Sequence, residues 1–413
     1  MTARRRTTAL IGDDNTVVVA GKSLTWRTLH KLPQLPSPAA VLVDNGADAL
    51  AALRHHAVHG TELLVATESR VDERMREELG ESGFAIALPN GEVTPAKLKR
   101  IEESGRAWLL TSGSTGRPKR IGHTLETLTT VTGEQPPRTW LLPYSPGTYA
   151  WWQVVTLSLT HADQGLVVIE PDELEDWPAI AAEHSVTAAS GTPTFWRQAL
   201  YRDADALGAV PLEQITLGGE PVDQAILDQL REIFPKARIS WIYASSEVGA
   251  SIVVHDGKAG FPREWLEREP GPDRPMLTVD GEELVIRSPH QGDGLVGPVR
   301  TGDRIEYDGD RVLITGRLDT DEINVGGSKV SAGIVRNVLM GHPGVSWARV
   351  FARKAPLVGR MVAAEVVPNP ELGPITHADL VQWCSNRLPD YGVPRRIRFL
   401  DEIPQKETLK SDV

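Results

Sequence analysis

Hydroxyl, glycine and lysine side chains are concentrated in one stretch, Leu109 to Lys119, which reads Leu-Leu-Thr-Ser-Gly-Ser-Thr-Gly-Arg-Pro-Lys. Glycines allow backbone N–H groups to converge on one point, and Ser and Thr hydroxyls add donors. Lys119 supplies a cation for a polyphosphate. The stretch differs from a Walker loop, in which Gly-Lys-Ser/Thr opens a helix, because Lys119 follows a proline and precedes Arg120. It predicts a phosphate-binding loop of another kind.

Further motifs follow this loop in a fixed order. They are Gly-Gly-Glu-Pro at 218–221, Tyr-Ala-Ser-Ser-Glu at 243–247, Arg-Thr-Gly-Asp at 300–303, Gly-Arg-Leu-Asp at 316–319, Leu-Pro-Asp-Tyr-Gly-Val-Pro at 388–394 and Pro-Gln-Lys-Glu-Thr-Leu-Lys at 404–410. Together with the loop they resemble the motifs of the adenylate-forming (AMP-binding) superfamily: acyl-CoA synthetases, peptide-synthetase adenylation domains and luciferases. The resemblance runs from about residue 20 to the C-terminus.

The resemblance implies roles in binding ATP and Mg²⁺. Asp303 would bind the ribose hydroxyls, Arg317 would help to fix the nucleotide, and Glu247 would hold Mg²⁺ while Ser246 donates to the α-phosphate. Ala244 and Ser246 stand where family members carry glycine and threonine. The remaining nucleotide-binding residues are expected to be Thr111, Ser112, Gly113, Ser114, Thr115, Gly116 and Lys119 at the phosphates, and Gly219, Glu220, Pro221, Tyr243 and Ala244 around the adenine.

A carboxylate attacks the α-phosphorus of ATP only if its repulsion from the polyphosphate is neutralised. Lys410, at the spacing of the family's closing motif, is the expected catalytic cation, together with Ser246 and Glu247. In the family this lysine is carried by a mobile C-terminal lid. The resemblance places the hinge of the lid at Asp319.

Aromatic residues occupy the segment that flanks the acyl site in the family. Tyr149, Trp151, Trp152 and, further along, Thr192 are the candidate substrate-pocket residues. Aromatic rings there would clamp a planar substrate, although the same rings would also suit a packed core. These residues favour a small aryl or aryl-acrylic acid over a long fatty chain.

The predicted function is ATP-dependent adenylation of a small carboxylic acid to acyl-AMP and pyrophosphate, followed by transfer to coenzyme A or an acyl carrier protein. One alternative is a diazotase, which activates nitrite for transfer to an arylamine. Another is a degenerate protein that only binds nucleotide. The joint presence of Lys119, Glu247, Asp303, Arg317 and Lys410 argues against the degenerate alternative.

These residues need an α/β framework to position them. Short Val- and Leu-rich runs at 40–43, 62–65 and 165–169, separated by helix-length segments, predict buried parallel strands. Alternating segments from Gly281 to Ile314, preceded by Asp-Gly turns, predict antiparallel strands. The expected architecture is a large domain of layered α/β sheets with a small antiparallel subdomain at 1–318, and a small α/β lid at 319–413. The phosphate loop begins earlier than in typical members, which predicts a shortened N-terminal subdomain.

Composition sets further bounds. The chain has 413 residues and a net charge of −11, which argues against a nucleic-acid surface, and it holds no apolar run long enough to span a bilayer. Its one cysteine, Cys384, excludes an intramolecular disulfide, fits a cytoplasmic protein and is predicted to be a packed thiol. The oligomeric state is left open.

Overall fold

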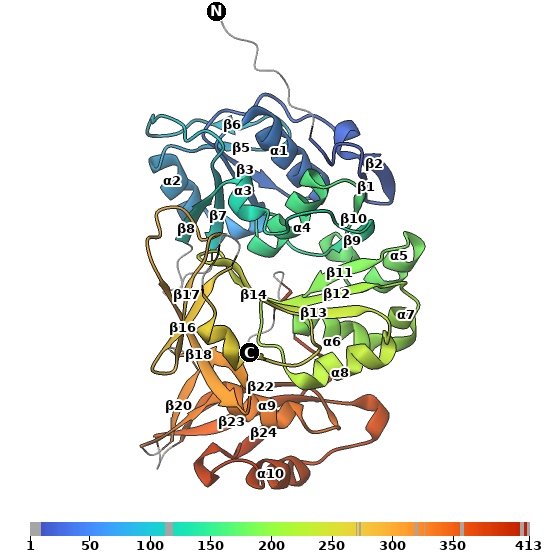
Figure 1. Cartoon of the computed structure of the whole chain (residues 1–413), viewed down its shortest axis with the longest axis vertical. Coiled ribbons are helices and arrows are strands. Elements are labelled where there is room, and N and C mark those ends of the chain that lie inside the picture. The colour runs from blue at the N-terminus through green and yellow to red at the C-terminus, as the bar shows by residue number, and fades with distance from the viewer. Residues whose placement is uncertain are drawn as a thin grey trace, which may run out of the picture.

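The computed structural model describes residues 10–111, 119–269, 271, 274–318, 321–325, 327–355, 359–404 and 409–410. Figure 1 shows the sheets arranged around a central region, with the C-terminal unit at the bottom. Within the described residues, no helix has both the length and the apolar character needed to cross a membrane.

The first layer is a six-stranded sheet in the order β6-β5-β3-β4-β7-β8. Its inner strands are parallel, as the Val- and Leu-rich runs predict, because both faces are buried. Its elements are β3 (Ala39–Val43), α1 (Gly46–His59), β4 (Leu63–Thr67), α2 (Glu73–Glu81), β5 (Ala85–Ala87), β6 (Val93–Thr94), β7 (Ala107–Thr111) and β8 (Lys119–His123).

The second layer is an eight-stranded sheet in the order β14-β13-β12-β11-β9-β10-β1-β2. Its strands are β1 (Thr16–Val19), β2 (Lys22–Thr25), β9 (Arg138–Leu142), β10 (Gln164–Val168), β11 (Ala188–Gly191), β12 (Gln214–Gly218), β13 (Arg238–Ser245) and β14 (Gly249–Val254). Its helices are α3 (Leu125–Leu128), α4 (Tyr149–Thr160), α5 (Trp177–Glu183), α6 (Pro193–Arg202), α7 (Ala204–Gly208) and α8 (Gln224–Ile233).

Helices in this layer begin at polar caps that follow the strands. Thr148, Thr192 and Asp223 accept backbone N–H groups at the N-termini of α4, α6 and α8. Because β9, β11 and β12 run parallel, their carboxyl ends reach the same edge of the sheet. The segments that follow these strands therefore meet at one place.

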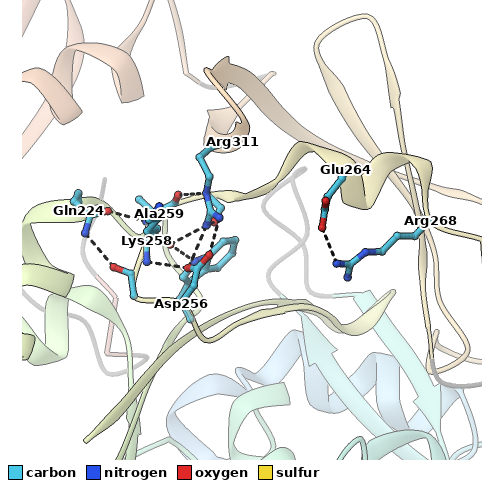
Figure 2. Close-up of polar contacts among 10 residues, drawn as sticks. Gln224, Asp256, Lys258, Ala259, Glu264, Arg268 and Arg311 are labelled. Carbon is cyan, nitrogen blue, oxygen red and sulfur yellow. Dashed lines mark hydrogen bonds and ion pairs between the residues drawn. The ribbon is translucent and has the colours of Figure 1, made fainter. Parts of the chain in front are cut away.

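The predicted antiparallel subdomain is a five-stranded sheet in the order β15-β19-β18-β17-β16. Its strands are β15 (Phe261–Pro262), β16 (Met276–Asp280), β17 (Glu283–Arg287), β18 (Val299–Asp308) and β19 (Arg311–Arg317). The loop before it is fixed by Arg311, whose guanidinium binds the carboxylate of Asp256 at 2.7 Å and the carbonyl of Ala259 at 3.1 Å (Figure 2).

The C-terminal unit is small and mixed. It contains β20 (Glu322–Val325), β21 (Ser328–Ser331), α9 (Ala332–Met340), β22 (Val345–Ala355), β23 (Gly359–Pro368), α10 (His377–Ser385) and β24 (Arg396–Phe399). Its apolar side chains form a core of their own between Ile323 and Ile397, which includes the fully buried Cys384. The prediction of a packed thiol is confirmed. Burial raises the pKa of this thiol to about 11.

Asp319, the predicted hinge, lies outside the described residues. The division of the chain at 318/319 therefore stays a prediction. Contacts between the C-terminal unit and the rest of the chain are nevertheless well defined. Gln198 on α6 donates to the carbonyl of Ile403 at 3.0 Å, and Tyr201 donates to the carbonyl of Asp401 at 2.8 Å.

Candidate active site

A cleft of about 1860 Å³ lies where the second layer, the antiparallel sheet and the C-terminal unit meet. It is lined by most of the predicted site residues that the structure describes: Thr111, Lys119, Tyr149, Thr192, Gly219, Glu220, Pro221, Tyr243, Ala244, Ser246, Glu247, Asp303, Arg317 and Lys410. Residues far apart in the sequence are thus brought to one cavity. Ser112, Gly113, Ser114, Thr115 and Gly116 lie outside the described residues.

The turn after β12 forms one wall of the cleft. Gly219 has φ +82°, a conformation that side-chain-bearing residues rarely adopt. A Cβ atom at this glycine would also lie 3.2 Å from Cε of Lys410. Glu220 accepts the backbone N–H of Thr194 at 3.0 Å, which ties the turn to the start of α6. The Gly-Gly-Glu-Pro motif therefore leaves room for a side chain that comes from the C-terminus.

Asp303 is a buried carboxylate of the cleft lining with two side-chain partners. The Tyr243 hydroxyl donates to one oxygen of its carboxylate, and Arg317 approaches the other at 3.3 Å. Burial raises the pKa of Asp303 against the lowering effect of these partners. Burial and the nearby carboxylate raise the pKa of Tyr243 well above its ordinary value. The pair fixes a hydrogen-bond acceptor in the cleft.

Arg300, the first residue of the Arg-Thr-Gly-Asp motif, has a supporting position. Its guanidinium forms ion pairs with Asp280 and Glu283 of the neighbouring strands. Glu283 also accepts the N–H of Gly302 at 2.9 Å. These contacts hold the turn that presents Asp303.

Another side of the cleft is bounded by Thr111, the last residue of β7, and Lys119, the first residue of β8. The Thr111 hydroxyl is buried and has no hydrogen-bond partner among the described residues, and Lys119 lies at the rim. Opposite them, the register shift between Tyr243 and Ala244 breaks the pairing of β13 with β14, just before Ser246 and Glu247. Hydroxyls and both charge signs therefore surround this part of the cavity.

His123 holds the loop that carries Ser246 and Glu247. Its Nε2 donates to the carbonyl of Ser246 at 2.8 Å, while its Nδ1 lies 3.0 Å from the Thr127 hydroxyl. Burial is the main cause of the lowered pKa of His123, which favours the neutral ring. Gly292 donates to the carbonyl of Glu247 at 2.8 Å from the other side. The carbonyl groups of Ser246 and Glu247 are thus both held by neighbouring residues.

Lys410 reaches the cleft because the preceding residue is anchored. The Leu409 side chain is fully buried in the core of the large unit, and its carbonyl accepts the hydroxyl of Thr192. Lys410 keeps access to solvent, but surrounding protein lowers its pKa by desolvation, opposed by Glu220 and Asp303. Lys410 therefore lies beside Gly219, with the carboxylates of Glu220 and Asp303 close enough to affect its pKa.

Two of the four predicted substrate-pocket residues, Trp151 and Trp152, need correction. Trp151 and Trp152 are 1% and 0% exposed, pack edge to face against each other, and lie among core residues away from the cleft lining. The helical rotation of α4 explains this, because Tyr149 and Gln153 point to the cavity while the two tryptophans point to the core. Thr192 lines the cleft, but its hydroxyl is engaged by Leu409 and by the N–H of Phe195. Tyr149 remains a cleft residue, and its hydroxyl accepts from the N–H of Ala250.

Sequence reasoning missed polar residues on the strands themselves. Gln214, Thr216, Arg238, Ser240 and His255 also line the cleft. Their signal was present: in 214–216 and 238–240 polar side chains alternate with apolar ones, which places them on one face of a strand.

Comparison with known proteins agrees with this geometry. Residues 14–295 match the AMP-binding enzyme family, and residues 335–410 match the AMP-binding enzyme C-terminal domain. A 3,4-dihydroxybenzoate–[aryl-carrier protein] ligase of Bacillus anthracis is 30% identical over 211 residues, which are 49% of this chain and 46% of that protein. A 2,3-dihydroxybenzoate-AMP ligase of Bacillus subtilis is 25% identical over 79% of this chain and 66% of its own length. This chain thus spans about half to two thirds of these relatives.

The fold also agrees with solved structures. The anthranilate CoA ligase AuaEII, in complex with anthranoyl-AMP, superposes with a TM-score of 0.72 at 16% identity, covering 97% of this chain and 93% of the ligase. None of the proteins named here is described as acting on nitrite, so the diazotase alternative gains no support. The match covers more than half of the chain with the predicted motifs in place, and the protein belongs to the AMP-binding enzyme family.

Proposed function

We propose that this protein adenylates a carboxylic acid with ATP and transfers the acyl group to a thiol. The observation that carries the proposal is the position of Lys410. It enters a cleft that is also lined by the Gly-Gly-Glu-Pro turn at 218–221, Asp303 and Glu247. A degenerate nucleotide-binding protein would have no need of a C-terminal lysine anchored at this point.

The first half-reaction forms one bond and breaks another. A carboxylate oxygen of the acid attacks the α-phosphorus, the bond from this phosphorus to the bridging oxygen breaks, and pyrophosphate leaves with the bond electrons. In this proposal Lys410 neutralises the charge between carboxylate and α-phosphate, and Asp303 holds the ribose. Ser246, supported through its carbonyl by His123, donates to the α-phosphate.

Mg²⁺ fits the site as a metal held mainly by the substrate. Among the described residues there is no group of three or more His, Cys, Asp or Glu side chains suited to bind a metal alone. Glu247 supplies one hard oxygen in the cleft, which suits a cation that keeps waters and binds phosphates. When bound, Mg²⁺ would offset the negative charge of the phosphates.

An aryl acid is the proposed substrate class. The two curated relatives described above are named for dihydroxybenzoate, and one of them is named for an aryl-carrier protein. Tyr149 adds an aromatic ring to the cleft next to Ala150 and Val154 of α4. Coenzyme A and a carrier protein remain the two candidate thiols for the second half-reaction.

The test is acid-dependent release of AMP from Mg·ATP, with acyl-AMP detected by mass spectrometry. A panel of aryl and alkyl acids is tested with and without coenzyme A. The proposal predicts acyl-AMP with an aryl acid, and a thioester when the correct thiol is present. AMP that forms only with nitrite and an arylamine would overturn it, as would ATP binding without turnover on any acid.

A further inference from the structure

The cleft extends from the nucleotide motifs along one face of the second-layer sheet, and we name this part the acid slot. Gln214 and Thr216 of β12 and Arg238 and Ser240 of β13 line it. They share a face because Gln214 pairs with Arg238 and Thr216 pairs with Ser240 in the parallel register. The opposite face of the same strands, with Ile215 and Ile239, is buried in the core.

This wall of the acid slot is polar and internally bonded. The Gln214 amide donates to the hydroxyls of Thr216 at 3.1 Å and Ser240 at 3.3 Å. Ser240 in turn lies 2.7 Å from Nδ1 of His255. Buried polar groups that satisfy one another form a fixed surface, whereas a long alkyl chain laid along it would make no hydrogen bonds.

Helix α4 lines the cleft beside these strands with a different chemistry. Tyr149, Val154 and Leu157 are its contributions. A slot with an apolar side and a polar side favours a flat ring system over a flexible aliphatic chain. It therefore supports an aryl acid independently of the relatives' names.

Arg238 is the first residue of β13 and lies at the exposed end of the polar wall, four residues before Ile242, the partner of Gly218. Its Nε donates to Gln214 at 2.5 Å, and no other side-chain partner of its guanidinium is found among the described residues. The neighbouring carboxylates are already paired: Glu213 with Arg138, and Asp256 with Arg311 (Figure 2). Arg238 therefore keeps an uncompensated positive charge and free N–H donors on its terminal nitrogens.

The length of the slot follows from the strand. Gln214, opposite Arg238, is four residues from Gly218, which corresponds to roughly 13 Å of extended strand. Gly219, the next residue, lies beside Lys410, where the proposed reaction places the reacting carboxylate. The backbone of Arg238 is thus separated from the backbone beside Lys410 by more than four residues of strand, a span that suits an elongated acid better than a single benzoate ring.

We infer that the substrate is an elongated aryl acid with a second carboxylate at its far end, bound by Arg238. The inference rests on the proposed function, since it names the substrate class of the same adenylation site. It places Arg238 as a specificity-determining residue, remote from the reacting atoms. Adenylation itself would be unchanged for acids that lack the second carboxylate.

Matched acids test the inference directly. With the wild-type protein, kcat/KM for acyl-AMP formation from biphenyl-4,4′-dicarboxylic acid should exceed that from biphenyl-4-carboxylic acid by about tenfold to a hundredfold, the effect of one charge-assisted hydrogen-bonded pair. Terephthalic acid should gain nothing over benzoic acid, because its second carboxylate does not reach Arg238.

The Arg238→Gln variant should remove the preference for the longer diacid by raising its KM, so that the ratio of kcat/KM for the diacid to that for the monoacid falls to about one. Arg238→Lys should keep part of the preference. Lys236→Gln, an exposed charge change outside the cleft lining, is the matched control and should behave as wild type. Thermal melts of all three variants report their folding.

The outcomes separate the two proposals. A wild-type preference for the monoacid, or an equal loss with both acids in Arg238→Gln, overturns the inference and leaves adenylation standing. Absence of acyl-AMP with every acid overturns the proposed function instead.

Discussion

His123 shows how one buried side chain supports reacting groups that it does not touch. We predict that His123→Ala lowers the adenylation rate about tenfold and raises the Mg²⁺ concentration needed for half-maximal rate, because the loop of Ser246 and Glu247 loses its bond at 2.8 Å. His123→Gln, whose amide N–H can replace Nε2, should recover most of the rate. If both variants lose stability and rate in parallel without a change in Mg²⁺ dependence, the role is only structural.

Lys410 should make the adenylation rate fall at alkaline pH. Its pKa is lowered from 10.5, mainly by desolvation, and the charged form is the one proposed to act. Activity is therefore present below the folded-state pKa and is lost as the pH rises through it, at a lower pH than for a lysine with its ordinary pKa. The pKa of Tyr243 is raised, so this hydroxyl does not account for the fall. In Lys410→Arg, the pH at which the remaining adenylation rate falls should move upward. A rate that falls at the same pH as in the wild type would contradict the role of Lys410 as the titrating cation.

At the residue scale, sequence predicted the nucleotide side of the site better than the acid side. The motif residues from Gly219 to Lys410 reach one cleft because their order matches a family whose loops follow strand ends. Trp151 and Trp152 were misplaced because the aromatic run does not reveal which side of α4 faces the core. The alternation around Arg238 indicates that its side chain shares a strand face with Ser240, but its position opposite Gln214 depends on the parallel pairing with β12, which no local pattern encodes.

At the element scale, the closing segment is held by Leu409. Its side chain is 0% exposed within the core of the large unit, although the residue has φ +62°. We predict that Leu409→Ala lowers adenylation tenfold or more, since losing a buried leucine costs about 2–5 kcal/mol and here the cost falls on the docked arrangement. Consumption of supplied acyl-AMP should change much less.

Leu372→Ala is the matched control for this prediction, because Leu372 is 60% exposed on the same C-terminal unit. Single-turnover measurements of both half-reactions distinguish the cases. Equal loss in both half-reactions for Leu409→Ala would mean that the leucine only stabilises the fold.

Element boundaries agree with the sequence patterns where periodicity was strong. The helix-length segment expected between the runs at 40–43 and 62–65 forms α1. The alternating stretch from Gly281 to Ile314 forms β17 to β19 of the antiparallel sheet. Docking of the C-terminal unit was not predictable, because it depends on tertiary contacts such as that of Gln198 with Ile403.

At the scale of the whole molecule, the large unit and the C-terminal unit have separate hydrophobic cores, and we expect each core to respond to urea separately. Cys384 is buried in the core of the C-terminal unit, and burial raises its thiol pKa to about 11. We predict that a disulfide reagent labels native protein at least a hundredfold more slowly than unfolded protein, since the thiolate is the reactive form. In a urea titration, labelling reports the C-terminal core while tryptophan fluorescence reports mainly the large core. Rapid labelling without urea would contradict this packing.

In the proposed reaction, the large unit binds ATP and the acid while the C-terminal unit brings Lys410 to them. The most direct measurement is acid-dependent exchange of labelled pyrophosphate into ATP, made with the wild type and with Lys410→Ala. We predict exchange that requires an aryl acid and falls by about 10²–10³ in the variant, as expected for loss of one transition-state donor. Wild-type protein that binds ATP but exchanges no pyrophosphate with any acid, or a variant that exchanges at the wild-type rate, would contradict it.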